Sequence, residues 1–124
     1  MSNLVNRSVS VGDLAAVTAS TTNFDLSNRN ARGVHLIIDI TARTSTSTLT
    51  VTIQGKDPVS GKYYDILATT ALSATGTTVL KVYPGLTAAA NAAANDIIPV
   101  EWRVKAVVAS AGAITCTLGA NMEF

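Results

Sequence analysis

Hydrophobic and polar residues alternate with a period of two along most of this chain. The clearest example is the run from Gly33 to Thr41, in which every second residue is a branched aliphatic one: Val34, Leu36, Ile38 and Ile40. Successive side chains of a β-strand point to opposite faces, so this alternation is typical of a strand with one face in a hydrophobic core. The other face of the same strand is expected to carry His35, Ile37, Asp39 and Thr41.

Further strands are predicted wherever the alternation recurs between clusters of Gly, Pro, Asn and Ser. The strong candidates are the run containing Leu49, Val51 and Ile53 and the segments Lys62 to Ala68, Thr77 to Tyr83, Val100 to Ala109 and Ala113 to Ala120. The weaker candidates are Ser8 to Val11, Leu14 to Ala19 and Thr22 to Leu26. In the Lys62 strand, Tyr64 and Ile66 should face one way and Tyr63, Asp65 and Leu67 the other.

Two connecting segments have distinctive sequences. In Asp57-Pro58-Val59-Ser60-Gly61, Pro suits the second position of a turn and Gly accepts a positive φ, which predicts a hairpin loop. The segment from Leu86 to Asp96 is rich in Ala and has helix propensity, so it could form a helical turn. It is short and weakly amphipathic, and a compact surface loop is the better interpretation.

The pattern of elements predicts an all-β protein with eight or nine strands and little or no helix. No amphipathic helix is long enough to connect parallel strands, so a single antiparallel β-sandwich is expected, of either jelly-roll or immunoglobulin-like type. The length of 124 residues suits one domain over residues 1–124, with residues 1–12 a candidate N-terminal arm.

Composition adds that the predicted surface is nearly neutral. Hydrophobic residues make up 48% of the chain and charged residues only 14%, with a net charge of +1, so the polar positions are mostly Thr, Ser and Asn. Charges of both signs are interspersed, which argues against nucleic-acid binding and membrane binding. A weakly charged sheet protein does little to protect its strand edges, which favours a homo-oligomer that covers them.

Cysteine content and the N-terminal sequence indicate where such a protein assembles. Cys116 is the single cysteine, so no disulfide can form within the chain. The N-terminal sequence lacks the apolar core of a signal peptide, and no apolar stretch reaches the length of a membrane helix. Assembly in a reducing cytoplasm is therefore expected.

Candidate chemistry is sparse, and no catalytic, cofactor-binding or metal-binding residue is predicted. His35 is the one histidine; it could pair with Asp39 two strand steps away, but it is better interpreted as a half-buried strand residue. Cys116 alternates with Ile114 and Leu118, which is typical of a core thiol. A pair of carboxylates for glycoside hydrolysis remains an open alternative, although no sequence feature singles out any two of the candidates. The candidates are Asp39, Asp57, Asp65, Asp96 and Glu101. No phosphate-binding loop is present.

Aromatic residues offer one binding alternative. A glycan-binding module needs an exposed aromatic platform, and the candidates for it are Tyr63, Tyr64, Tyr83 and Trp102. Aromatic strand residues at these spacings are more often part of the core. The test that separates the two interpretations is whether Trp102 is exposed.

Four segments, in order, resemble a known group of proteins: the hairpin QGKDPVSGKYY, the strand end VYPGLT, the Ala/Asn-rich loop, and the strand that includes PVEWRV. They are similar to small structural proteins of tailed bacteriophages, and the resemblance covers about Val34 to Leu118. It implies a virion protein assembled in the bacterial host cytoplasm, whose partners are the major capsid protein or other virion subunits. The expected role is capsid decoration or cement as a homo-oligomer, with a trimer favoured; a head-to-tail connector or tail-associated subunit is the alternative.

Contact residues are predicted in two segments. The N-terminal segment is polar enough to become ordered on binding, and the Ala/Asn-rich loop is apolar enough to pack on a neighbour. The alternatives are a frayed terminus and an ordinary surface loop. The candidate interface residues are Ser2, Asn3, Leu4, Val5, Asn6, Arg7, Ala88, Ala89, Ala90, Asn91, Ala92, Ala93, Ala94 and Asn95.

Overall fold

The computed structural model describes residues 7–28 and 31–123, and within these ranges it contains nine strands and no helix. The strands, in chain order, are β1 (Arg7–Val17), β2 (Ser20–Ser27), β3 (Gly33–Arg43), β4 (Thr48–Lys56), β5 (Tyr63–Ala68), β6 (Gly76–Val82), β7 (Ala93–Ala94), β8 (Glu101–Ala109) and β9 (Ile114–Glu123). The prediction of an all-β protein with little or no helix is confirmed.

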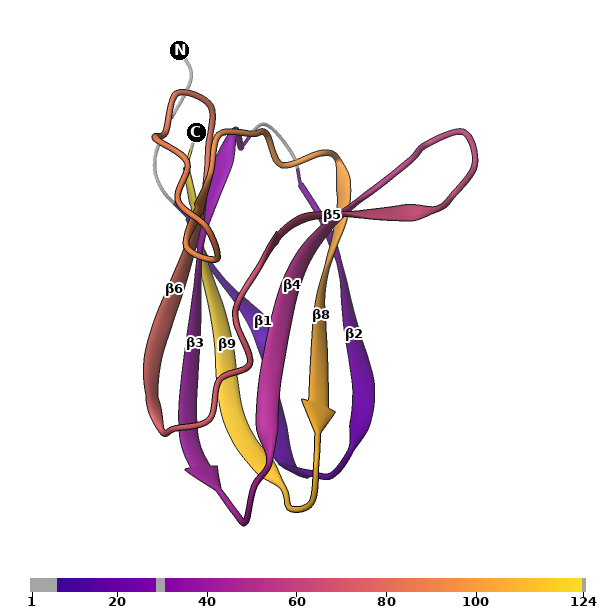
Figure 1. The fold of residues 1–124 in the computed structure, drawn as a ribbon. Coiled ribbons are helices and arrows are strands. Elements are labelled where there is room, and N and C mark those ends of the chain that lie inside the picture. The colour runs from indigo at the N-terminus through magenta and orange to yellow at the C-terminus, as the bar shows by residue number, and fades with distance from the viewer. Residues whose placement is uncertain (1–6, 29–30, 124) are drawn as a thin grey trace.

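The strands form two sheets that pack face to face as a sandwich (Figure 1). One sheet has the order β1-β9-β3-β6-β7 and the other the order β2-β8-β4-β5. The pairs β1 with β9, β2 with β8, β3 with β6, and β4 with β5 are all antiparallel. Without the two-residue β7, the first strand thus pairs with the last, the second with the second-last, and so on. This is one long hairpin rolled into two sheets, the jelly-roll member of the two architectures expected.

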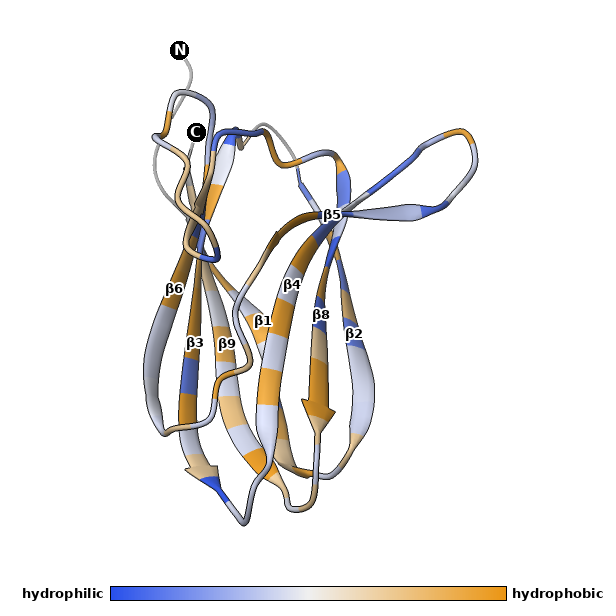
Figure 2. Cartoon of the chain, viewed as in Figure 1, coloured by the Kyte–Doolittle hydropathy of each residue, from blue (hydrophilic) through white to orange (hydrophobic). Residues whose placement is uncertain are grey.

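The core lies between the sheets and contains the side chains that the alternation predicts. On β3, Val34, Leu36, Ile38 and Ile40 are all buried, as are Leu49, Val51 and Ile53 on β4. The inward faces of β8 and β9 contribute Trp102, Val104, Ala106, Val108, Ile114, Cys116 and Leu118. Figure 2 shows the resulting alternation of hydrophobic and hydrophilic residues along these strands.

The predicted faces of β5 are wrong for part of the strand. Ile53 is opposite Leu67, whereas the next residue of β4, Gln54, is opposite Asp65, so Ile66 is an extra residue in a bulge. A bulge shifts every later side chain by one position. Leu67 therefore enters the core while Asp65 stays exposed, where its Oδ1 accepts a hydrogen bond of 2.7 Å from Gln54 Nε2.

The first two weak strand candidates form one strand rather than two. β1 runs through both segments, with register shifts against β9 between Ser10 and Gly12 and between Leu14 and Val17. The predicted N-terminal arm, residues 1–12, falls partly outside the described residues, at 1–6. Its second half, from Arg7 to Gly12, is paired with β9 and therefore belongs to the sandwich.

The connections gather at two ends of the sandwich. Residues 57–62 and 83–100, together with Asn28, Ala31 and Arg32, lie at the end where β3 and β8 begin, and residues 18–19, 44–47 and 110–113 lie at the opposite end (Figure 1). The segment 83–100 returns from one sheet to the other over the first end. Within this segment, the two residues of β7 pair in parallel with Lys81 and Val82 and so cover the outer edge of β6.

Candidate subunit-contact surface

Large apolar side chains that are exposed gather at one end of the sandwich. Four of the five exposed large hydrophobic residues in the described chain lie there: Val59 at 94% exposure, Val100 at 70%, Ile97 at 56% and Tyr64 at 49%. Pro58 is exposed and Pro99 half-buried in the same loops. We call these six residues, Pro58, Val59, Tyr64, Ile97, Pro99 and Val100, the apolar end.

The opposite end is built from small residues. Its connections are Thr18-Ala19, Thr44-Ser45-Thr46-Ser47 and Ser110-Ala111-Gly112-Ala113. Hydrogen bonds hold two of these turns together, since Thr44 Oγ1 accepts from the Ala113 amide at 2.8 Å and the Thr44 amide donates to the Ala113 carbonyl at 3.0 Å. Among the described residues, the large exposed apolar side chains are therefore concentrated at one of the two ends.

The apolar end contains a groove between the β4–β5 hairpin and the start of β8. Its volume is about 460 Å³, and it is lined by Lys56, Pro58, Pro99, Val100 and Glu101. Lys56 Nζ lies 3.5 Å from Glu101 Oε2, so the two charges on the rim neutralise one another. The groove is thus apolar and without net charge, which suits contact with another protein surface.

The hairpin that forms one wall of this groove has a self-contained turn, as predicted. The Asp57 amide donates to the Lys62 carbonyl at 2.8 Å, and the Asp57 carboxylate accepts from the Val59 amide at 3.0 Å and from the Ser60 hydroxyl at 2.7 Å. These two bonds lower the pKa of Asp57. The loop extends beyond the sheets (Figure 1) and carries Val59 at its tip.

A buried asparagine holds the other wall. Asn28 is only 6% exposed, and its Nδ2 donates to the carbonyls of Ala31 at 2.7 Å and Ile98 at 2.8 Å. The backbone amide of Asn28 donates to the Val100 carbonyl. The chain segment that presents Ile97 and Val100 is thereby fixed to the connection between β2 and β3.

The described parts of the two predicted contact segments lie at this same end. Ser2, Asn3, Leu4, Val5 and Asn6 are outside the described residues. Arg7, the first residue of β1, starts a row of paired residues that crosses the sheet. The row continues through Met122 of β9, Val34 of β3 and Val82 of β6, and it ends at Ala94 of β7. One row across the sheet therefore joins the start of β1 to the predicted loop.

The Ala/Asn-rich loop itself has no helical turn. Ala88 to Ala92 are exposed, Ala93 and Ala94 form β7, and Asn95 Oδ1 accepts from the Gly85 amide at 2.8 Å. Asn91 has a positive φ of 59°, and its Nδ2 donates to the Ala68 carbonyl at 2.9 Å. The loop presents small side chains on a backbone fixed by hydrogen bonds.

The residues considered for catalysis are dispersed. His35 is half-buried on the outer face of β3, opposite Lys81 and Asn121, with its ring centre 6.3 Å from that of Tyr83. Cys116 is fully buried, and burial raises the pKa of its thiol to about 11. Over residues 7–28 and 31–123, no group of three or more His, Cys, Asp or Glu side chains is placed to hold a metal ion.

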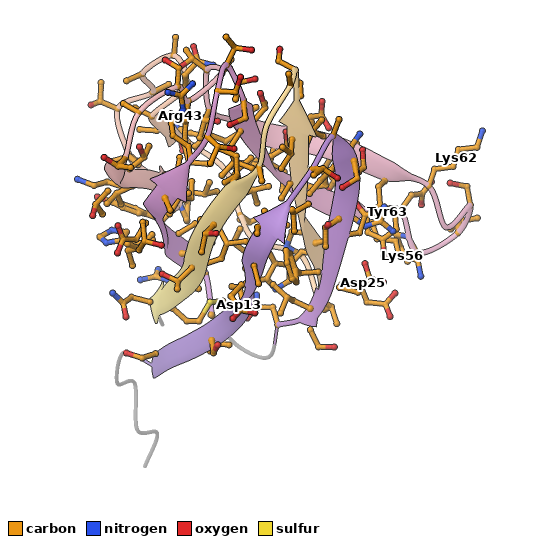
Figure 3. The ribbon with its side chains drawn as sticks, turned by 90° about the horizontal axis from the view of Figure 1, so that it is seen from below. Asp13, Asp25, Arg43, Lys56, Lys62 and Tyr63 are labelled. Carbon is orange, nitrogen blue, oxygen red and sulfur yellow. The ribbon has the colours of Figure 1, made fainter. Side chains whose placement is uncertain are left out.

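The aromatic residues do not form a common platform. Trp102 is 2% exposed and belongs to the core. Tyr63 lies on the outer face of β5, where the Arg103 guanidinium stacks 3.4 Å from its ring centre while Arg103 Nε contacts Asp25 at 3.1 Å. Figure 3 shows Tyr63, Lys56 and Asp25 close together, with Lys62 farther out on the hairpin. Tyr83 directly follows β6, which belongs to the other sheet, and lies near His35.

Sequence reasoning missed most of the apolar end. Val59, Ile97 and Val100 stand next to turn residues or at a strand boundary, where alternation gives no information on burial. The signal that could have found Val59 and Val100 is an aliphatic residue directly beside proline in a loop, as in Pro58-Val59 and Pro99-Val100.

Comparisons with known proteins add no relative. No protein-family model matches the chain, and no curated protein matches its sequence significantly. The likeness to phage structural proteins therefore depends on the four sequence segments alone. Within the described residues, no helix has the length and apolar character required to cross a membrane.

Proposed function

We propose that this chain is a non-enzymatic structural protein of a tailed-bacteriophage virion, which decorates or cements the capsid shell as an oligomer, with a trimer favoured. The observation that carries the proposal is the apolar end, where exposed apolar side chains gather and three of them, Pro58, Pro99 and Val100, line a groove without net charge. A free monomer rarely exposes such a cluster, and a clustered apolar surface is typical of a protein contact.

Two further features support a structural role. Jelly rolls are used repeatedly by viral capsid proteins, which is an analogy of fold and not of site. A decoration protein binds many equivalent places on a lattice, so modest contacts gain strength by multivalency and require area rather than chemistry. The neutral surface and the rigid hydrogen-bonded loops of the apolar end suit such a contact.

The test is the copy number of this chain in purified virions, measured by quantitative mass spectrometry against the major capsid protein. A decoration protein should be present in numbers comparable to the capsid subunits. A few copies per particle would overturn decoration and favour the connector or tail alternative. Absence from the particle would overturn the virion proposal altogether.

A further inference from the structure

The four strand edges of the two sheets differ in how they are protected. β7 is two residues long, and β5 is short and bulged. β1 has two register shifts against β9. Short edge strands and bulges are devices that prevent another strand from pairing with an edge. Three of the four edges are thus poor templates for an added strand.

β2 is the exception. All eight of its residues, from Ser20 to Ser27, pair with β8 in one unbroken register, and in the described chain no strand lies on its other side. It contains no proline and no lysine. Its single charged residue, Asp25, is already paired with Arg103 at 3.1 Å. β2 therefore presents a regular, nearly neutral row of backbone donors and acceptors, the geometry required for strand addition.

The side chains of β2 also leave apolar surface uncovered. Thr22, Phe24 and Leu26 point toward the core, opposite Ala106, Val104 and Trp102, yet each is only half-buried because the edge is open beside them. Phe24 packs on Gly12 of β1, closing the sandwich on this side. A strand added to β2 would cover these three side chains and extend the core.

We propose that β2 pairs antiparallel with β2 of a second copy of this chain, which joins the two four-stranded sheets across a two-fold axis. In such a pair, residues on the same face stand opposite one another. An axis at Phe24 places Phe24 against itself, Thr22 against Leu26 and Asn23 against Asp25. An aromatic pair and two threonine–leucine pairs thus meet on the inner face, and an amide meets a carboxylate on the outer face. The two Asp25 side chains are kept apart, so the strand is complementary to itself.

This contact goes beyond the proposed virion role and does not depend on it. A two-fold contact closes on itself as a pair, so it is a different contact from the one that would build the favoured trimer. β2 is an edge strand on the opposite side of the sandwich from β6 and β7 (Figure 1), and none of its residues belongs to the apolar end. The two proposals can therefore fail separately.

Disulfide crosslinking tests the pairing directly. Asn23→Cys and Asp25→Cys change exposed outer-face residues, and native Cys116 is fully buried and gives little background. A mixture of the two variants should form a disulfide dimer under mild oxidation, more than either variant alone. Dimers from Asn23→Cys alone would move the axis to Asn23 and still support the pairing. The control is Ser10→Cys on the bulged β1 edge, and a mixture that crosslinks no more than this control overturns the proposal.

Sedimentation of the native chain supplies a second measurement. It should show a concentration-dependent dimer. Thr22→Lys puts an inward-pointing charge on the β2 edge and should raise the dimer dissociation constant by about tenfold or more. Thr50→Lys, on the outer face of the interior strand β4, should leave it unchanged, and circular dichroism verifies that both variants fold. A chain that remains monomeric, or a dimer equally weakened by both changes, overturns the proposal.

Discussion

The side-chain amide of Asn28 donates to the carbonyl oxygen of Ile98 at 2.8 Å, across 70 positions of sequence, in a site only 6% exposed. The same nitrogen also donates a hydrogen bond to the Ala31 carbonyl. Two buried acceptors therefore depend on one side chain, and a buried acceptor without a donor is costly.

Asn28→Ala is expected to lower the free energy of unfolding by about 1–3 kcal/mol, because both carbonyls lose their donor. Urea denaturation measures the change. Asn121→Ala is the control: Asn121 is exposed on β9 and bonds only with the Ser8 hydroxyl among the described side chains, so its loss should stay within about 0.5 kcal/mol. Equal effects of the two substitutions would contradict the structural role assigned to Asn28.

Two strand glycines should respond in opposite ways to the same substitution. A Cβ on Gly33 would overlap the carbonyl oxygen of Val82 and the Cβ of Tyr83, so the backbone would have to move. A Cβ on Gly119 meets no described atom within 4 Å. Gly33→Ala should destabilise the fold by about 1–3 kcal/mol, whereas Gly119→Ala should be neutral or slightly stabilising because alanine has less backbone entropy to lose. Thermal unfolding of the two variants would decide, and a stable Gly33→Ala protein would show that β3 and β6 are less closely packed.

Burial of Cys116 predicts a pH dependence above neutrality. The pKa of its thiol is raised from 9.0 to about 11 in the folded chain. Between these values the unfolded thiol ionises while the folded one stays protonated, so the unfolded state gains and stability falls as pH rises. The contribution is complete well below pH 9, and the loss reaches about 2 kcal/mol by pH 11.

The measurement for this effect is the difference in unfolding free energy between the native chain and Cys116→Ala at several pH values from 8 to 11. Every other ionisable group is shared by both chains, so its contribution cancels in the difference. The native chain should lose more stability than the variant with rising pH. A difference that does not vary with pH would mean that the thiol is accessible to solvent.

Trp102 provides an optical test of the core and of the glycan alternative. It is the single tryptophan, and at 2% exposure its emission should be blue-shifted and resistant to acrylamide quenching. Its Nε1 has no hydrogen-bond partner in the described chain. Trp102→Phe, which removes that unpaired donor, should therefore cost less than the roughly 3–5 kcal/mol expected for Trp102→Ala. Emission that shifts on adding oligosaccharides would revive a sugar-binding role.

The central strands could be predicted from sequence because both of their neighbours are strands and one face is fully buried. On β3 the four aliphatic residues from Val34 to Ile40 are all in the core, as the alternation requires. β8 follows the same rule from Trp102 to Val108. Alternation does not specify which strands pair, however, so the choice between jelly-roll and immunoglobulin-like order needed the structure.

The errors occur where a single residue changes the register or where no period exists. The bulge at Ile66 moves Asp65 and Leu67 to opposite faces, although the sequence there alternates normally. The shifts in β1 divide its pattern into two segments that were expected as separate strands. The apolar end was missed because burial in a turn is decided by long-range contacts, such as the one between Asn28 and Ile98.

The apolar end itself predicts the last result. Val100→Asp and Val59→Asp place a charge on side chains that are 70% and 94% exposed, so they should change stability by no more than about 0.5 kcal/mol. If the apolar end contacts the shell, each charge must lose water on binding without gaining a partner, and affinity for the shell should fall by about tenfold or more. Co-sedimentation with capsids assembled without this protein measures the binding. Thr46→Asp, exposed at the small-residue end, is the matched control and should bind like the native chain. Weaker binding by Thr46→Asp, with native binding by both valine variants, would assign the contact to the opposite end.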